Sequence, residues 1–211
     1  PQDDSIRDHL PMVELLARFL GTLLDTDLKR IEQARILERC QEEALIDSMT
    51  GLFNRKGWDR ALVTEESRAR RYGSPACVLI VDLDDLKQVN DSAGHADGDQ
   101  VIRAAARCIR GQLRESDTVA RIGGDEYAVL GIECGALAAD NLSRKISGAL
   151  SAQGIQASVG MAMRDPRRGF AAAVADADQA MYAAKAERRT QRSGEASPVP
   201  SGEFERADDA G

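Results

Sequence analysis

The sequence predicts an α/β protein in which helices cover a central mixed, mainly antiparallel sheet. Residues 76–81 form a continuous apolar run rich in β-branched side chains, which is typical of a buried central strand. Residues 118–122 and 127–132 are two further strand-like segments joined by a short turn that contains two glycines. Helical segments alternate with these strands, and this order indicates a sandwich of helices packed on a sheet.

The N-terminal part of the chain is predicted to be helical up to about residue 47. Apolar residues such as Leu16, Leu20 and Leu23 recur there at helical spacing, and a thinner apolar seam continues to Leu45. A long helix with a narrow apolar stripe usually pairs with another helix, here a second copy of the chain. Packing on the chain's own domain is the alternative, because the heptads are irregular.

The folded domain is assigned from helix and strand signals in chain order. Asn54 can cap a helix that runs to about Tyr72, and Gly73 then ends it. The later predicted elements are a short helix over 86–91, helices over 97–110 and 136–151, a strand over 155–163 and a last helix over 170–189.

These elements predict three regions of chain. Residues 1–46 form a helical signalling or dimerisation linker, and residues 47–190 form the folded domain. Residues 191–211 are rich in Ser, Gly, Pro, Glu and Asp, and this composition predicts a disordered tail.

Composition and charge narrow the class of function. The chain has 211 residues and a formal net charge of −7, which argues against a general nucleic-acid binder. Its four cysteines lack metal-ligand spacing, so we interpret them as residues of a protein in a reducing compartment. No stretch is long and apolar enough to span a membrane, and no signal peptide opens the chain. We therefore expect a soluble, cytoplasmic protein.

Acidic residues stand at the end of the central strand and at the hairpin turn. Asp82 ends the buried strand, where an ionised carboxylate needs a partner or a metal. Gly123 and Gly124 can take positive φ, which a tight hairpin needs, and Asp125 and Glu126 follow them. If the central strand lies beside the hairpin, these carboxylates meet and suit Mg²⁺. An aspartate-rich turn and a solvated hairpin tip are the simpler alternatives.

Basic and amide side chains near these carboxylates suggest a nucleotide substrate. Bound Mg²⁺ ions would change the local electrostatic potential from negative to positive, so the site would attract a polyphosphate. Lys87, Lys185 and Arg189 would then hold the terminal phosphates. Asn90 and Asp99 have the donors and acceptors to read a base edge, and Asp99 would accept from the N–H groups that guanine offers.

Taken together, these motifs resemble the GGDEF family of diguanylate cyclases over about residues 46–190. Each motif is weak alone, but the ordered set is specific. The matching segments are residues 47–55, 82–87, 90–91, 94–95, 98–99, the signature at 123–127 and residues 181–185.

The resemblance implies a role for each matched position. Asp82 and Asp125, with the carbonyl of Leu83, would bind Mg²⁺ or Mn²⁺, and Glu126 would assist metal binding or deprotonate the attacking hydroxyl. The implied nucleotide-binding residues are Asn90 and Asp99 for guanine, and Lys87, Lys185 and Arg189 for the phosphates.

The implied reaction is condensation of two GTP into cyclic di-GMP with release of two pyrophosphates. It takes place in a homodimer in which each subunit supplies one half-site, and the N-terminal helix would bring the half-sites together. Arg114 and Asp117 match the Arg-x-x-Asp product site of members subject to feedback inhibition, although alone they would be a surface ion pair. Residues 1–45 resemble the closing helix of a GAF-type sensor followed by a signalling linker.

Four positions depart from the family pattern. Tyr127 replaces phenylalanine in the signature, and we expect activity to survive because the ring is kept. Leu86 replaces an aromatic residue, and Arg188 precedes Arg189 where a glycine is usual. Lys145 stands where an arginine sometimes supports the product site, which predicts weaker binding of the inhibitor across the dimer.

Two other classes of function remain open. One is a catalytically silent module that binds cyclic di-GMP or GTP and signals through the helix. The presence of Asp82, Asp125, Glu126 and Lys185 argues against it, because a silent module need not keep them. The other is a purely structural dimerisation module.

Overall fold

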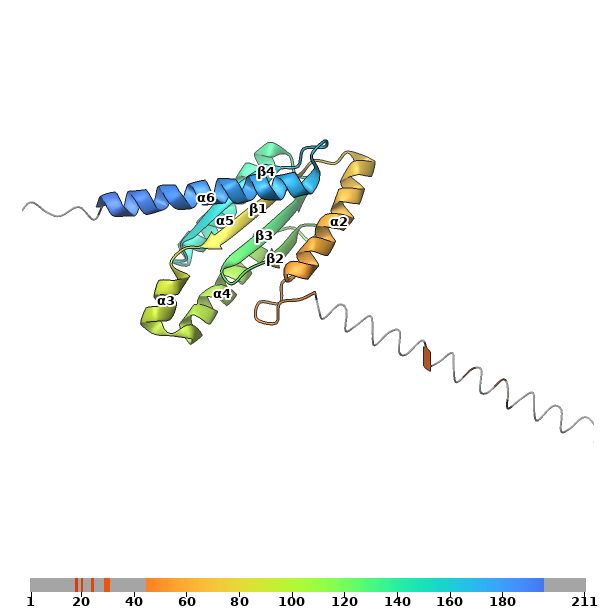
Figure 1. Cartoon of the computed structure of the whole chain (residues 1–211), viewed down its shortest axis with the longest axis horizontal. Coiled ribbons are helices and arrows are strands. Elements are labelled where there is room, and N and C mark those ends of the chain that lie inside the picture. The colour runs from red at the N-terminus through yellow and green to blue at the C-terminus, as the bar shows by residue number, and fades with distance from the viewer. Residues whose placement is uncertain (1–17, 19, 21–23, 25–28, 31–44, 196–211) are drawn as a thin grey trace, which may run out of the picture. The chain divides into compact units, whose positions relative to one another are not determined.

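The structure is a computed structural model that describes residues 18, 20, 24, 29, 30 and 45–195 (Figure 1). It separates the chain into two units, Pro1–Ile46 and Asp47–Gly211. Residues 18, 20, 24, 29 and 30 are helical, as predicted, whereas residues 45–47 are not, so the predicted end of the helix near residue 47 is wrong. The other residues of the predicted helix, and its pairing with a second helix, lie outside the described residues. The part of the predicted tail (191–211) that follows residue 195 also lies outside them. Within the described part of the chain, no helix has the length and apolar character needed to cross a membrane.

Four strands of the second unit form one sheet in the order β2-β3-β1-β4. All three strand pairings are antiparallel, which confirms the predicted mainly antiparallel sheet. The central position of β1 also agrees with its apolar sequence. The strands are β1 (Ala76–Leu83), β2 (Thr118–Arg121), β3 (Glu126–Ile132) and β4 (Ala157–Met163).

Helices cover both faces of this sheet, so the unit has three layers (Figure 1). Helices α4 and α5 supply the buried side chains on one face, and α2 and α6 supply those on the other. The helices are α2 (Arg55–Tyr72), α3 (Leu86–Ala93), α4 (His95–Arg110), α5 (Ala136–Ala152) and α6 (Gly169–Glu195). Helix α6 continues to Glu195, beyond its predicted end at Arg189, so the first residues of the predicted tail are helical.

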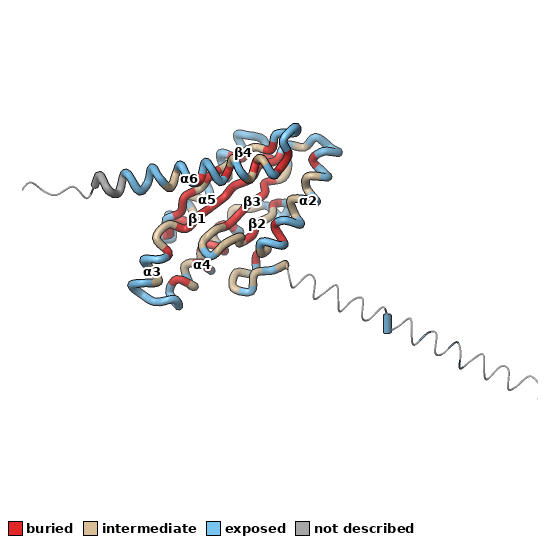
Figure 2. The backbone as a smooth tube through the Cα atoms, in the orientation of Figure 1, coloured by how far each residue is buried: buried red, intermediate tan, exposed pale blue. Residues whose placement is uncertain are grey.

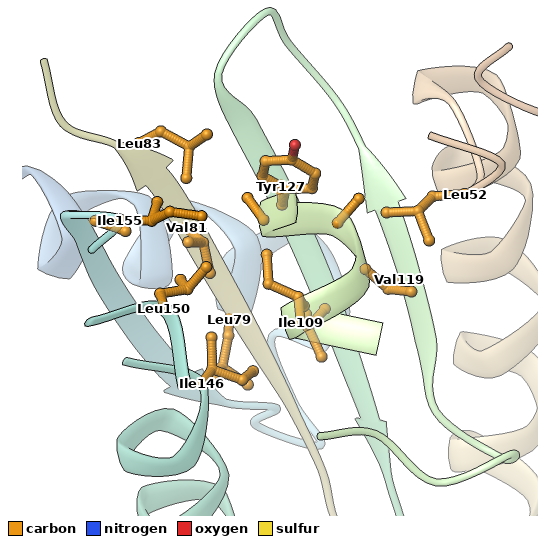
Figure 3. Close-up of a cluster of buried hydrophobic side chains, with 14 of the residues drawn as sticks. Leu52, Leu79, Val81, Leu83, Ile109, Val119, Tyr127, Ile146, Leu150 and Ile155 are labelled. Atoms are coloured by element: carbon orange, nitrogen blue, oxygen red, sulfur yellow. The ribbon is translucent and has the colours of Figure 1, made fainter. Parts of the chain in front are cut away.

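Strand β1 is buried along its whole length because both of its faces are covered (Figure 2). Leu79 and Val81 point into the core beneath α4 and α5 (Figure 3). Val78 and Ile80 belong to the core formed with α2 and α6. Successive side chains of a strand point to opposite faces, so a strand covered on both sides requires an unbroken apolar run.

Helix α2 is bounded by the two caps that the sequence predicts. The Asn54 side chain accepts a hydrogen bond from the Gly57 N–H at 3.1 Å. At the other end, Gly73 has φ 68°, and its N–H donates to the Ala69 carbonyl at 2.9 Å. A left-handed residue at this position favours glycine, which explains why the helix stops there.

An ion pair between Glu66 and Arg164 ties α2 to the segment before α6. The Arg164 guanidinium donates to both carboxylate oxygens of Glu66, at 3.0 and 2.7 Å. The Phe170 N–H also donates to this carboxylate at 2.9 Å. The Arg164 side chain is only 3% exposed. Its hydrogen bonds, opposed by burial, lower the pKa of Glu66 from its ordinary 4.5 to about 2.

We expect Glu66→Gln to destabilise the protein by about 2 kcal/mol at pH 7, because Arg164 would lose its charged partner. The pKa of Glu66 is lower in the folded state, so its stabilisation is present above about pH 4.5 and is lost as the pH falls toward 2. Urea unfolding at pH 7 and pH 3 measures both effects. Glu65→Gln is the control, because Glu65 forms an ion pair with the exposed Arg68 one turn along the same helix. This change should alter stability by less than about 0.5 kcal/mol. Equal losses for the two variants would contradict the assignment.

Candidate active site

The strand register brings the predicted acidic residues together. Asp82 of β1 lies directly opposite Glu126 of β3. The next residue, Leu83, donates its N–H to the carbonyl of Asp125 at 2.9 Å. Two segments that are far apart in the sequence therefore place Asp82, Asp125 and Glu126 at one end of the central strand pair.

Asp82 faces α6, where it meets Lys185. Its place on the strand matches that of Val78 and Ile80, whose side chains pack toward α2 and α6. Lys185 Nζ donates to Asp82 Oδ1 at 2.5 Å. Asp82 is 6% exposed, and Lys185 is half-buried. This pair is the closest contact between the acidic strand end and a basic residue of the predicted site.

The acidic strand end holds more negative charge than Lys185 offsets. Burial raises the pKa of Asp82, the Lys185 hydrogen bond opposes this, and the charges of Asp125 and Asp84 raise it further, so the net shift is upward. Burial lowers the pKa of Lys185, but the hydrogen bond to Asp82 and the neighbouring carboxylates outweigh it and raise that pKa. An additional cation would therefore be stabilised here.

Glu126 lies in the same negative field. Burial raises its pKa, and the charges of Asp125, Asp82 and Asp178 raise it further. Arg55, at the start of α2, acts in the opposite direction. Glu126 is therefore held among carboxylates on the side of the sheet that α2 and α6 cover.

The donor atoms fit a hard divalent cation that is shared with a substrate. Within the described residues, no group of three or more His, Cys, Asp or Glu side chains is arranged to hold a metal ion by itself. The predicted set is instead two carboxylates, Asp82 and Asp125, with the carbonyl of Leu83. Mg²⁺ is commonly bound by one or two carboxylates while substrate phosphates and water complete its coordination. The charge excess at Asp82 is consistent with such a site.

The glycines of the turn do not have the conformation that the sequence analysis predicted. Positive φ is found at other glycines of the described residues, and neither Gly123 nor Gly124 is among them, so that prediction is wrong. Gly123 instead lies close to Glu126: a Cβ there would lie 2.6 Å from Glu126 Oε2, so a larger residue would require the Glu126 carboxylate to shift. A glycine at this position therefore lets the Glu126 side chain lie against the turn.

Arg121 holds this turn, and the sequence analysis did not identify it. Its Nε and Nη2 donate to the Gly124 carbonyl at 3.2 and 2.7 Å. Its Nη1 lies 3.4 Å from both carboxylate oxygens of Asp47, which also accepts from the Thr50 N–H and hydroxyl. Arg121 thus connects the opening turn of the domain to the residue before Asp125. An arginine next to a glycine turn gives no local signal of a partner so far away in the sequence.

A cleft of about 620 Å³ opens beside the end of β1. Five of the predicted site residues line it: Leu83, Lys87, Asp125, Lys185 and Arg189. These residues come from β1, α3, α6 and the β2–β3 turn. The structure therefore brings the predicted phosphate-binding residues and two of the three predicted metal ligands, Leu83 and Asp125, to the same cavity.

The two predicted base-reading residues lie on the neighbouring helices α3 and α4. Asn90 rests against Gly98, where a Cβ would lie 1.9 Å from Asn90 Oδ1. Asp99, the next residue, lies 3.5 Å from Arg103. Among the described residues, Asn90 and Asp99 are not in the set that lines the cleft. Asn90 therefore lies at the contact between α3 and α4, next to the residue before Asp99, and neither of the two predicted base-reading residues lines the cavity.

Arg114 and Asp117 line a separate pocket of about 190 Å³, together with Lys145. Asp117 is buried, and its carboxylate accepts from the Arg114 N–H at 3.0 Å and from the Ile132 N–H at 3.2 Å. The Arg114 side chain is exposed. Asp117 therefore fixes the turn that presents Arg114, in addition to any role in binding.

The tyrosine in the signature is accommodated without an unsatisfied hydroxyl. Tyr127 is fully buried in the core beneath α4 (Figure 3). Its hydroxyl donates to the Ile102 carbonyl at 2.8 Å. A buried hydroxyl with a partner avoids the cost of an unpaired polar group, so this residue fits the core at that position.

The fold and the site define a class of α/β domain with acidic residues on paired antiparallel strands, beside a cleft that is lined by both carboxylates and basic side chains. Comparison with protein families places the chain within that class. The family model described as diguanylate cyclase, GGDEF domain, matches residues 44–191. The chain belongs to this family.

Individual relatives agree with the family match. The chain is 40% identical over 157 residues to the diguanylate cyclase TpbB of Pseudomonas aeruginosa, covering 69% of this chain and 36% of TpbB. It is 38% identical over 122 residues to the probable diguanylate cyclase DgcC of Escherichia coli, covering 57% of this chain and 32% of DgcC. The chain thus matches about a third of the length of these relatives.

Solved structures with the same fold include two GGDEF domains. The coiled coil and GGDEF domain of DgcB from Caulobacter crescentus, in complex with c-di-GMP, gives a TM-score of 0.71 at 27% identity, covering 80% of this chain and 95% of that one. The GGDEF domain of TpbB from Pseudomonas aeruginosa gives 0.60 at 37% identity, covering 67% and 89%.

Proposed function

We propose that this chain is a diguanylate cyclase, which condenses two GTP into cyclic di-GMP and releases two pyrophosphates. The observation that carries the proposal is the register of β1 and β3. It sets Asp82 opposite Glu126 and bonds Leu83 to Asp125, beside a cleft lined by basic side chains. Carboxylates next to cations are the arrangement that a metal-bound triphosphate requires.

The nucleotide would be held by groups from three elements. Lys87, Lys185 and Arg189 would contact the phosphates, and Asn90 and Asp99 would read guanine. Asp82, Asp125 and the Leu83 carbonyl would hold Mg²⁺ or Mn²⁺, which when bound supplies positive charge to the triphosphate. Binding would release Lys185 from Asp82 toward the phosphates, because the cation takes over the carboxylate.

Each of the two new P–O ester bonds forms when the 3′-hydroxyl of one GTP attacks the α-phosphate of the other GTP. The bond from that α-phosphate to the β-phosphate breaks, and pyrophosphate leaves. Glu126 would accept the hydroxyl proton or assist in holding the cation. One half-site holds one nucleotide, so the reaction requires a homodimer that places two half-sites face to face. Orientation of the two nucleotides would then contribute much of the rate enhancement.

The second pocket supports feedback inhibition by the product. Arg114 is exposed at its rim, and Lys145 lines the same pocket, so two cations are available to the phosphates of cyclic di-GMP. Asp117 is already bonded to the backbone through its carboxylate, which keeps the turn in place.

The test is chromatographic analysis of the products formed by the purified chain with GTP and Mg²⁺, with and without ATP. We expect cyclic di-GMP and two pyrophosphates for every two GTP consumed, no incorporation of adenine, and no product from Asp125→Ala. A wild-type protein that is dimeric and binds GTP but forms no dinucleotide would contradict the proposal. Such a result would favour the silent binding module instead.

A further inference from the structure

Arg188 is a second arginine of α6 that faces the cleft, next to the predicted phosphate-binding Arg189. Helix α6 continues through both residues to Glu195. A glycine at residue 188 would favour the end of a helix, whereas an arginine allows the helix to continue. Both arginines line the cleft beside the end of β1.

The contacts of Arg188 are long and partly open to solvent. Its Nη1 lies 3.5 Å from Asp84 Oδ2 and 3.5 Å from Gln156 Oε1. A charge-assisted N–H···O bond is normally about 2.7–2.9 Å, so these contacts are weak. The Arg188 side chain is 44% exposed. The Arg188 guanidinium could therefore leave Asp84 and bind an anion in the cleft with little loss of free energy.

Asp84 does not depend on Arg188 for its position. Its carboxylate also accepts from the Ser158 hydroxyl, at 3.1 and 3.2 Å. Its N–H donates to the Gln156 carbonyl at 2.9 Å. Asp84 would keep these hydrogen bonds if Arg188 turned toward another anion.

Arg188 makes the number of cations that line the cleft equal to the number of carboxylates. Lys185 precedes Arg188 by three residues, so both lie on one face of α6. The residues that line the cleft include four carboxylates, Asp84, Asp85, Asp91 and Asp125, and four cations, Lys87, Lys185, Arg188 and Arg189. Without Arg188 the lining would be net negative and would repel a nucleotide triphosphate.

We propose that Arg188 is a further phosphate-binding residue, which exchanges its contact with Asp84 for a phosphate when a nucleotide triphosphate enters the cleft. The inference rests on the proposed function, because it assigns one more contact to the same substrate. A guanidinium suits this role, since its planar set of donors can bind two oxygens of one phosphate group.

The test is isothermal titration calorimetry of the full chain with Mg²⁺ and guanosine 5′-(α,β-methylene)triphosphate, which cannot release pyrophosphate. We expect Arg188→Ala to weaken binding about tenfold, as for loss of a charge-assisted hydrogen bond. Arg188→Lys should lose less, because it keeps the charge but not the planar donors. Titration with inorganic tripolyphosphate should show the same order, because the contact is to phosphate.

The matched control is Arg107→Ala, which removes an exposed arginine from α4, outside the residues that line the cleft. It should bind the analogue as the wild type does. Equal affinities of wild type and Arg188→Ala would overturn the inference and leave the proposed function intact. An equal loss in Arg107→Ala would also overturn it, since net charge alone would then explain the effect. If the wild type itself fails to bind the analogue, the proposed function fails.

Discussion

Gly160→Ala is expected to destabilise the protein by at least about 3 kcal/mol, because α6 crosses β4 too closely for a side chain. A Cβ at Gly160 would lie 2.1 Å from the Ala177 carbonyl oxygen and 2.1 Å from the Met181 nitrogen. Both are backbone atoms, so no change of rotamer relieves the overlap. Helix α6 would have to move away from the sheet, and Lys185, one turn beyond Met181, would move away from Asp82.

Gly148→Ala is the matched control for this change. Gly148 lies within α5 and is exposed, and a Cβ there would meet nothing within 4 Å. We expect a gain of about 0.5–1 kcal/mol, because alanine favours the helix over glycine. Urea unfolding of both variants measures the difference. A Gly160→Ala protein as stable as the wild type would contradict the close packing of α6 on β4.

Asp82→Asn is expected to reduce cyclic di-GMP formation by about a thousandfold or more and to leave the fold intact. The change removes a charge that the proposed cation site needs. Stability should change by less than about 1 kcal/mol, because two effects oppose each other. Lys185 loses its partner but still has Asp84 and Asp125 nearby, and the protein no longer buries a carboxylate among like charges.

Asp140→Asn, on the exposed surface of α5, is the control for removing one negative charge. Its rate of product formation and its midpoint of thermal unfolding should equal those of the wild type. An Asp82→Asn enzyme with more than about a tenth of wild-type activity would show that Asp82 is not needed for the reaction.

The sequence predicted those parts of the fold that leave a local signal. The run at residues 76–81 predicted β1 because both faces of that strand are covered. Asn54 and Gly73 predicted the ends of α2 because helix caps act within a few residues. Asp82 was expected to meet Asp125 if its strand lay beside the hairpin, and the pairing of β1 with β3 confirms that arrangement.

The parts that could not be predicted depend on contacts between segments far apart in the chain. Arg121 is bound to Asp47 and to the turn, and no local spacing relates these groups. Gly123 was expected to take positive φ, whereas it lies outside that region and packs against the Glu126 side chain. The contacts of Arg188 with Asp84 depend on how α6 lies over the end of β1. Each feature follows from packing geometry, which composition and periodicity do not determine.

The central claim is that Asp82, near the end of β1, and Asp125, in the β2–β3 turn, jointly bind a divalent cation that carries a nucleotide triphosphate. Electron paramagnetic resonance of Mn²⁺ with the full chain and the α,β-methylene analogue of GTP tests it most directly. We expect the wild-type protein to bind Mn²⁺ far more strongly when the analogue is present than when it is absent. The Asp82→Asn variant should lose this increase in Mn²⁺ binding. Equal binding of Mn²⁺ by the wild type and Asp82→Asn in the presence of the analogue would contradict the claim.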